Sequence, residues 1–186
     1  MKRNIIIIFF LILTLSVLVL VTRSNQDTRS KAAFIAPTST LLPPSLRLAT
    51  TEQAFDSGQP IPIHVLVNTN GRPTVEAYII LRFDNQVLSI GPEDIQRADV
   101  YPVVNIESAG QGKLALSLFT TLEAGYAPIE TREEVEIATA VFHAKKAGQT
   151  TISVEQESGL FTLRDKDSGQ SDNILISTDG VTIKIN

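Results

Sequence analysis

Residues 74–90, TVEAYIILRFDNQVLSI, decide the fold class of this chain. Successive side chains of an extended strand point to opposite faces, and two sets alternate along this stretch. The set that we expect to be buried is Ala77, Ile79, Leu81 and Phe83. The set that we expect to face outward is Glu76, Tyr78, Ile80 and Arg82. Asp84-Asn85 predicts a turn because Asx side chains bond to nearby backbone, and the apolar run resumes at Val87. The stretch therefore predicts two strands joined by a polar turn.

The composition is that of a folded, acidic chain without thiol chemistry. Hydrophobic residues make up 43% of the 186 residues, which is enough for a core and argues against disorder. The formal net charge is −4. Without Lys2 and Arg3 at the tip, 14 cations remain against 20 acids, which argues against nucleic acid as a partner. The absence of cysteine excludes disulfides, thiolate metal sites and a cysteine nucleophile.

The amino terminus predicts a membrane anchor. Residues 1–4 form a short basic tip, and residues 5–21 are apolar except for Thr14 and Ser16. As a helix this run spans roughly 26 Å, close to the ~30 Å thickness of the hydrocarbon layer. Since no small-residue cleavage site follows, we expect an uncleaved transmembrane signal-anchor helix. Lys2 and Arg3 then hold the tip in the cytoplasm, and the rest lies outside, at the cell surface. Cleavage and secretion of a soluble form is the alternative.

The remainder reads as a linker followed by one β-domain. Residues 22–44 are polar and then rich in Pro, Ser and Thr, as in a spacer. From residue 45 to 186, short apolar runs alternate with turn signals. The predicted strands are 45–49, 61–67, 74–90 as a pair, 103–108, 113–119, 136–144, 150–154, 159–163, 173–177 and 181–185. After Val21 no helical apolar stripe lasts three turns, so we expect an all-β fold of two antiparallel sheets packed as a sandwich.

Four passages, in this order, resemble the cohesin domain. They are PIPIHVLVN at 60–68, AYIILRFDNQVL at 77–88, IATAVFHAKKAG at 137–148 and DGVTIKI at 179–185. The resemblance covers residues 45–186 and implies a jelly-roll β-sandwich, a fold that cohesins share with some carbohydrate-binding modules. It also implies a non-catalytic role, because cohesins dock dockerin modules.

The resemblance indicates where a partner would bind. In type I cohesins the docking face includes outward residues of the strand before a Tyr-Asp-Pro turn. Glu76 and Tyr78 stand where those cohesins place Asn and Asp, and Phe83-Asp84-Asn85 replaces the turn and keeps only its acid. The candidate partner-binding residues are Glu76, Tyr78, Ile80 and Arg82. An apolar centre with a polar rim suits a protein partner, and cross-strand packing is the simpler explanation of Tyr78 and Ile80.

The sequence favours binding over catalysis. It holds no H-E-x-x-H, P-loop, G-x-G-x-x-G or G-x-S-x-G pattern. His64 and His143 lie at outward positions of separate predicted strands, and the acids Glu133, Glu134 and Glu136 read as a solvated cluster. We expect no cofactor. We therefore predict a docking module for a dockerin-like or other envelope protein.

Two further binding chemistries fit the sequence less well. Asp165 and Asp167 beside Gly169 could hold calcium, but no terminal bidentate Glu follows, so an ordinary polar loop is preferred. Polysaccharide binding is the first alternative function. It is weakened because Trp is absent and the tyrosines are limited to Tyr78, Tyr101 and Tyr126. A structural part in an envelope assembly is the second alternative.

Overall fold

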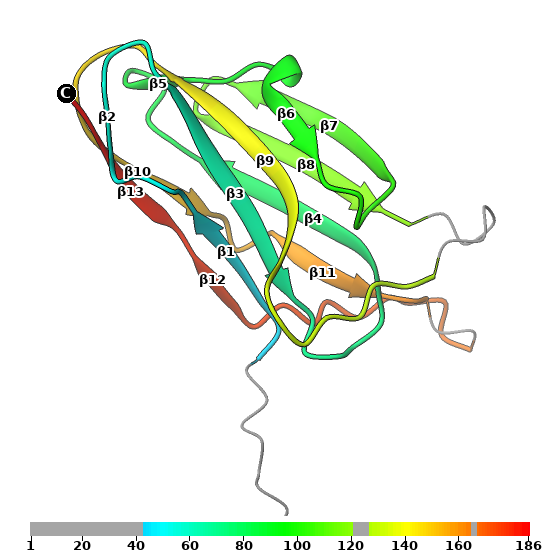
Figure 1. Ribbon diagram of the computed structural model, residues 1–186. Helices are drawn as coiled ribbons and strands as arrows, with labels where there is room; N and C mark the ends of the chain where they lie inside the picture. Colours follow the sequence, from blue (N-terminus) through cyan, green and yellow to red (C-terminus); the bar gives the residue numbers. More distant parts are fainter. Residues whose placement is uncertain (1–42, 121–126, 165–166) are drawn as a thin grey trace, which may run out of the picture. The chain divides into compact units, whose positions relative to one another are not determined.

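Two layers of β-strands make up the described part of this computed structural model, residues 43–120, 127–164 and 167–186 (Figure 1). The expected cytoplasmic tip, the anchor helix and all of the linker except its last two residues lie outside those ranges. Within those ranges no helix is long and apolar enough to cross a membrane. The all-β sandwich expected from the alternating patterns is confirmed.

The first sheet has the strand order β12-β1-β3-β9-β5, and β6 also pairs with β9. Its strands are β1 (Ser45–Ala49), β3 (Pro60–Asn68), β5 (Leu88–Ser89), β6 (Ile95–Arg97), β9 (Val135–Ala144) and β12 (Ser177–Asp179). A short 3-10 turn, η1 (Pro92–Asp94), leads into β6. The long pair β3–β9 forms the middle of this sheet, and its outward residues include Pro62, His64 and Val141.

The second sheet has the order β2-β13-β10-β4-β8-β7, and β11 also pairs with β4. Its strands are β2 (Ala54–Phe55), β4 (Thr74–Arg82), β7 (Val103–Gly110), β8 (Lys113–Phe119), β10 (Gly148–Val154), β11 (Gly159–Thr162) and β13 (Val181–Ile185). The central strand β4 pairs with β8 on one side and with β10 and β11 on the other. The stretch that opened the sequence analysis thus lies in the middle of the sheet.

The core lies between the two layers, as the alternation predicts. Ala77, Ile79 and Leu81 are fully buried, and Phe83 is nearly so. Their cross-strand neighbours on β8, Leu114, Leu116 and Leu118, are also fully buried. The Phe83 ring meets the ring of Phe142 on β9 edge to face, with centroids 5.1 Å apart. Because each such large side chain contributes about 1.5–3 kcal/mol on burial, this layer-to-layer packing stabilises the sandwich.

The predicted turn after β4 is present, and it moves the chain from one sheet to the other. The Asp84 carboxylate accepts the Gln86 N–H at 2.8 Å, and its carbonyl accepts the Leu88 N–H at 2.9 Å. The next strand, β5, pairs with β9 in the first sheet instead of returning along β4. The two predicted strands are therefore real, but they belong to opposite layers.

The expectation of purely antiparallel sheets is wrong at two edges. β1 pairs with β12 in parallel, and β2 pairs with β13 in parallel. The chain crosses from the first sheet to the second twice near these edges, once between β1 and β2 and once at Gly180, between β12 and β13. There the backbone passes so close that a Cβ on Gly180 would lie 2.6 Å from the Ile152 carbonyl oxygen. Glycine is required because the neighbouring atoms belong to the backbone of β10.

The predicted strand at 173–177 is also wrong. Apart from one isolated bridge at Asn173, residues 173–176 are irregular, and β12 begins at Ser177. The Asn173 side-chain oxygen accepts the N–H groups of Leu160 and Leu175, each at 3.1 Å. The Ile176 N–H then turns to the Pro44 carbonyl at 3.0 Å. A side chain therefore supplies hydrogen bonds that a strand partner would otherwise supply.

Candidate functional site

Three aromatic side chains gather on the outer surface of the second sheet. Cross-strand neighbours share a face, so the register defines two adjacent rows. The first row is Val103–Phe119–Glu76–Phe161, and the second is Asn105–Ser117–Tyr78–Gly159. We call the surface made by Val103, Phe119, Glu76, Phe161 and Tyr78 the aromatic face. All five residues are partly exposed, so they remain accessible to a partner.

A carboxylate holds Tyr78 across the neighbouring strand. The Tyr78 hydroxyl donates to Glu107 Oε2 at 3.1 Å, and Ser117 Oγ donates to Glu107 Oε1 at 2.8 Å. Glu107 lies on β7, two strands from Tyr78, so the tyrosine side chain extends over Ser117 on β8. The β7–β8 register shifts between Ile106 and Ser108, and this bulge adds Glu107 to the outward side. Burial and the bond to Glu107 raise the pKa of Tyr78 above its ordinary value.

The Phe161 ring occupies space that a side chain at Gly159 would otherwise fill. A Cβ on Gly159 would lie 2.7 Å from the ring atoms Cε2 and Cζ of Phe161. The ring therefore lies over the glycine, which is itself opposite Tyr78. A larger residue at Gly159 would displace the ring. The positions of the Tyr78 and Phe161 rings are therefore set on the two sides of β4 before any partner binds.

The structure separates the four residues that the sequence proposed for partner binding. Glu76 and Tyr78 lie on the aromatic face. Ile80 points outward but is only 5% exposed, between its cross-strand neighbour Ala115 and the turn that holds Ser158. Its N–H donates to Ser158 Oγ at 2.9 Å. Arg82 is exposed at the far end of β4, where its Nε donates to Glu155 at 2.7 Å.

Sequence reasoning missed the phenylalanines. Phe119 has the outward parity in its strand, a signal that was present but attached to no partner. Phe161 lies in the short strand β11, whose neighbour could not be known from the sequence. Only the pairing of β8 and β11 with β4 places both beside Glu76. Val103 joins them through its pairing with Phe119.

The histidines and acids elsewhere form ordinary polar contacts. His64 Nδ1 lies 3.0 Å from Glu136 Oε2 and 3.2 Å from Thr139 Oγ1. Because both partners share one ring nitrogen, the cluster lacks the relay of a nucleophile, base and orienting acid. His143 Nε2 contacts Asp94 at 2.9 Å, and Arg47 pairs with Glu134.

The remaining sequence candidates give no second site. Tyr101 is fully buried, with its hydroxyl 3.0 Å from Thr74 Oγ1, so it cannot contribute to a sugar platform. Tyr126 and Asp165 lie outside the described residues. Among the residues that are described, including Asp167, no three His, Asp or Glu side chains gather as metal ligands would.

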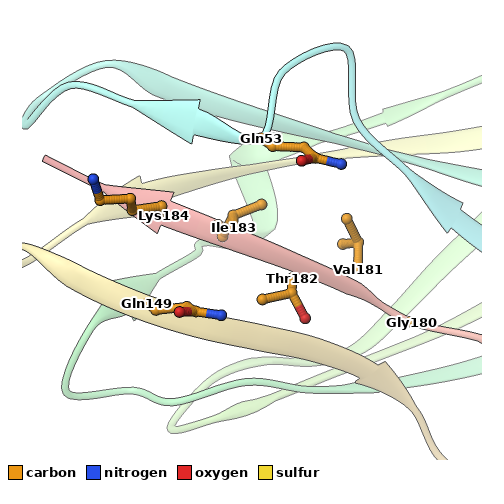
Figure 2. A pocket seen from close by; sticks show the side chains of 7 residues that line it. All are labelled: Gln53, Gln149, Gly180, Val181, Thr182, Ile183 and Lys184. Atoms are coloured by element: carbon orange, nitrogen blue, oxygen red, sulfur yellow. The ribbon is translucent and has the colours of Figure 1, made fainter.

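Two hollows lie away from the aromatic face. One, of about 470 Å³, borders β13 and includes Gln53, Gln149 and Lys184 (Figure 2). The other, of about 740 Å³, lies on the outer side of the first sheet, over Pro62 and His64. The second hollow is also lined by Glu136 and Thr139, the two residues that contact His64.

Comparison with known proteins identifies the fold. No family model and no curated protein matches the sequence. Solved structures do match. The seventh ScaB type I cohesin of Pseudobacteroides cellulosolvens has a TM-score of 0.61 at 12% identity, covering 77% of this chain and 92% of that one. A non-cellulosomal cohesin of Archaeoglobus fulgidus has a TM-score of 0.57 at 13% identity, covering 77% and 91%.

A third similar structure was solved with a binding partner. It is the sixth cohesin of scaffoldin B from Acetivibrio cellulolyticus, in complex with a dockerin, with a TM-score of 0.57. Its identity to this chain is 13%, and the match covers 77% of this chain and 99% of that one. The fold is therefore a cohesin-like jelly roll, as the resemblance in the sequence implied.

Proposed function

We propose that this protein is a non-catalytic docking module that binds a protein partner through its aromatic face. The observation that carries the proposal is the row Val103–Phe119–Glu76–Phe161 beside the tethered ring of Tyr78. Partly exposed aromatic side chains on a rigid sheet supply contact area at low entropic cost, as in the centres of many protein interfaces. The resemblance to cohesins favours the same surface, because the docking face of type I cohesins includes the outward residues of the strand before the turn.

The partner that fits the fold best is a dockerin-like module. The Acetivibrio cellulolyticus cohesin was solved with a dockerin. Fold alone does not determine function. The aromatic face is therefore the evidence for docking, and the fold suggests only the class of partner. Another envelope protein that presents a complementary helix would use the same surface.

We also propose that the module is displayed at the cell surface by an anchor. Residues 5–21 would form the transmembrane helix, and residues 22–44 would separate it from the sandwich. A proline-rich chain of that length reaches up to roughly 70 Å when extended, which is enough to clear the lipid headgroups. Fractionation of cells expressing the full chain tests this. A soluble product that begins near Ser24 would contradict it.

Polysaccharide binding is the weaker alternative. Sugar platforms need ring faces in an uninterrupted plane, whereas the Glu76 carboxylate stands between Phe119 and Phe161. A structural role in an envelope assembly predicts no specific ligand for the face at all.

One binding experiment distinguishes these functions. The full chain in detergent would be tested against calcium-loaded dockerin modules and against a glycan array. We expect protein binding that Tyr78→Ala and Phe119→Ala each weaken about tenfold or more, as hot-spot residues do. Val141→Ala, an apolar position on the outer side of the first sheet, is the matched control and should bind normally. Glycan binding lost in Tyr78→Ala, with no dockerin bound, would favour the alternative.

A further inference from the structure

Glu76 places a carboxylate between two phenylalanines, and no described residue forms an ion pair with it. Phe119 and Phe161 are its cross-strand neighbours on β8 and β11. In the part of the chain that the structure describes, no hydrogen bond or ion pair to the Glu76 side chain occurs. Its charge is partly shielded from water by the strands on both sides, since it is only partly exposed. A partner that covered it without a counter-charge would bury an unpaired carboxylate.

Along β4 and β8, no cation lies close enough to supply that counter-charge. The nearest outward cations along β4 and β8 are Arg82 and Lys113, which are cross-strand neighbours. Arg82 already pairs with Glu155. Arg82 lies six positions after Glu76 on the same strand, a distance of roughly 20 Å, which exceeds the ~8 Å screening length at physiological salt. The outward cations of β4 and β8 therefore leave the Glu76 end of the aromatic face acidic.

Glu107 adds to this negative character. Its two oxygens accept hydrogen bonds from Tyr78 and Ser117, and both donors are neutral hydroxyl groups. The two hydroxyl donors therefore fix the position of the Glu107 carboxylate and bring no opposite charge to it. Of the two acids at the aromatic face, the Glu76 carboxylate can accept hydrogen bonds from a partner, whereas the Glu107 carboxylate already accepts them from Tyr78 and Ser117.

We infer that the partner inserts an arginine side chain beside Glu76, between Phe119 and Phe161. This inference rests on the proposed function and names the chemistry that the docking face selects. A guanidinium group can donate two parallel hydrogen bonds to one carboxylate, and it can stack on phenyl rings. Lysine could satisfy the charge but not the bidentate geometry or the stacking. Arginine is thus the side chain that matches all three neighbours.

A charge-reversal experiment tests the inference without a known partner. A phage-displayed library of random dodecapeptides would be selected against the full chain in detergent, and against the variants Glu76→Gln and Glu76→Lys. Face-directed peptides are those whose binding is lost in Phe161→Ala. Glu133→Lys is the matched control, because Glu133 is an exposed acid in the segment before β9, outside the aromatic face.

We expect face-directed peptides to be enriched in arginine next to an apolar residue. Glu76→Gln should weaken them about tenfold, or about 1.4 kcal/mol, and replacement of the peptide arginine by lysine should also weaken them. Glu76→Lys should select aspartate or glutamate in place of arginine, whereas Glu133→Lys should keep the arginine preference. Melting curves of each variant would verify that the sandwich stays folded.

The outcomes separate the two proposals. Face-directed peptides without arginine enrichment, or with a preference that Glu76→Lys does not change, would overturn the arginine inference and leave the docking function standing. Failure to obtain any peptide sensitive to both Phe161→Ala and Tyr78→Ala would count against the docking function and the arginine inference together. Binding of a neutral glycan with an affinity that Glu76→Lys does not change would also count against both proposals.

Discussion

The buried pair of Tyr101 and Thr74 allows a quantitative test of the packing at the start of β4. Thr74 Oγ1 donates its one proton to the Ile129 carbonyl at 3.0 Å. The Tyr101 hydroxyl must therefore donate to Thr74 Oγ1, from which it lies 3.0 Å. Tyr101 is fully buried, so no water can replace Thr74 as its acceptor. The direction of each bond follows from counting protons.

The direction of the bonds makes the two single substitutions unequal. Tyr101→Phe removes one ordinary hydrogen bond and should cost about 1 kcal/mol. Thr74→Val leaves a buried phenol without an acceptor and should cost about 2–3 kcal/mol. The Ile129 carbonyl is not orphaned in that variant, because it still accepts the Thr74 backbone N–H at 2.9 Å. In the Thr74→Val background, Tyr101→Phe should be neutral or stabilising, since it removes the orphaned group.

Urea unfolding of the full chain in detergent, followed by far-ultraviolet circular dichroism, measures all four free energies. We expect a coupling energy of about 1–2 kcal/mol between the two positions. Additivity within about 0.5 kcal/mol would refute the reasoning, because independent sites behave in that way. So would a greater loss of stability from Tyr101→Phe than from Thr74→Val.

Two further predictions concern the chain crossing and the surface charges. Gly180→Ala should destabilise the sandwich by about 2–3 kcal/mol, since its Cβ would meet the Ile152 carbonyl oxygen at 2.6 Å and backbone cannot rotate away. Gly58→Ala is the control: Gly58 has a φ of 83° but open space around it, so only the backbone strain of about 1 kcal/mol remains. Equal melting temperatures for the two variants would contradict the steric argument. The hydrogen bond from Arg47 lowers the pKa of Glu134 below its ordinary value, and burial opposes this. A lowered folded pKa stabilises the fold above the unfolded value of 4.5, and this contribution is lost as the pH falls through the folded pKa. Thermal unfolding at several pH values should therefore show Glu134→Gln slightly less stable than the parent at pH 7, by less than about 1 kcal/mol, and equal to it near pH 3. A difference that persists in acid would refute this account.

The strongest sequence inferences were those that depend on the chain alone. Side chains alternate between the two faces of a strand, so the side chains of β4 and β8 that face the core could be predicted from the sequence. Short Asx side chains bond locally, so the turn at Asp84 was also readable. The predicted strand at 173–177 failed for the opposite reason. Asn173 satisfies the backbone of another segment, and no local pattern reveals which segment that is.

The candidate site shows the same division more sharply. The alternation in residues 74–82 put Glu76 and Tyr78 on an outer face, and that much came from sequence. Ile80 has the same parity, yet the turn at Ser158 and the neighbour Ala115 cover it. Parity determines the direction of a side chain, whereas exposure depends on what packs beside it.

Sequence alone determined that this chain would form extended strands with one apolar face each, because that property depends only on the alternation of apolar and polar residues along each strand. Which strands became neighbours was decided by tertiary structure. Pairing brings Phe119 and Phe161, from segments far apart in the chain, to either side of Glu76. It also buries Tyr101 and takes β5 into the opposite layer. These outcomes depend on the packing of distant segments, and the aromatic face, which is made from four strands, exists only once those strands have paired.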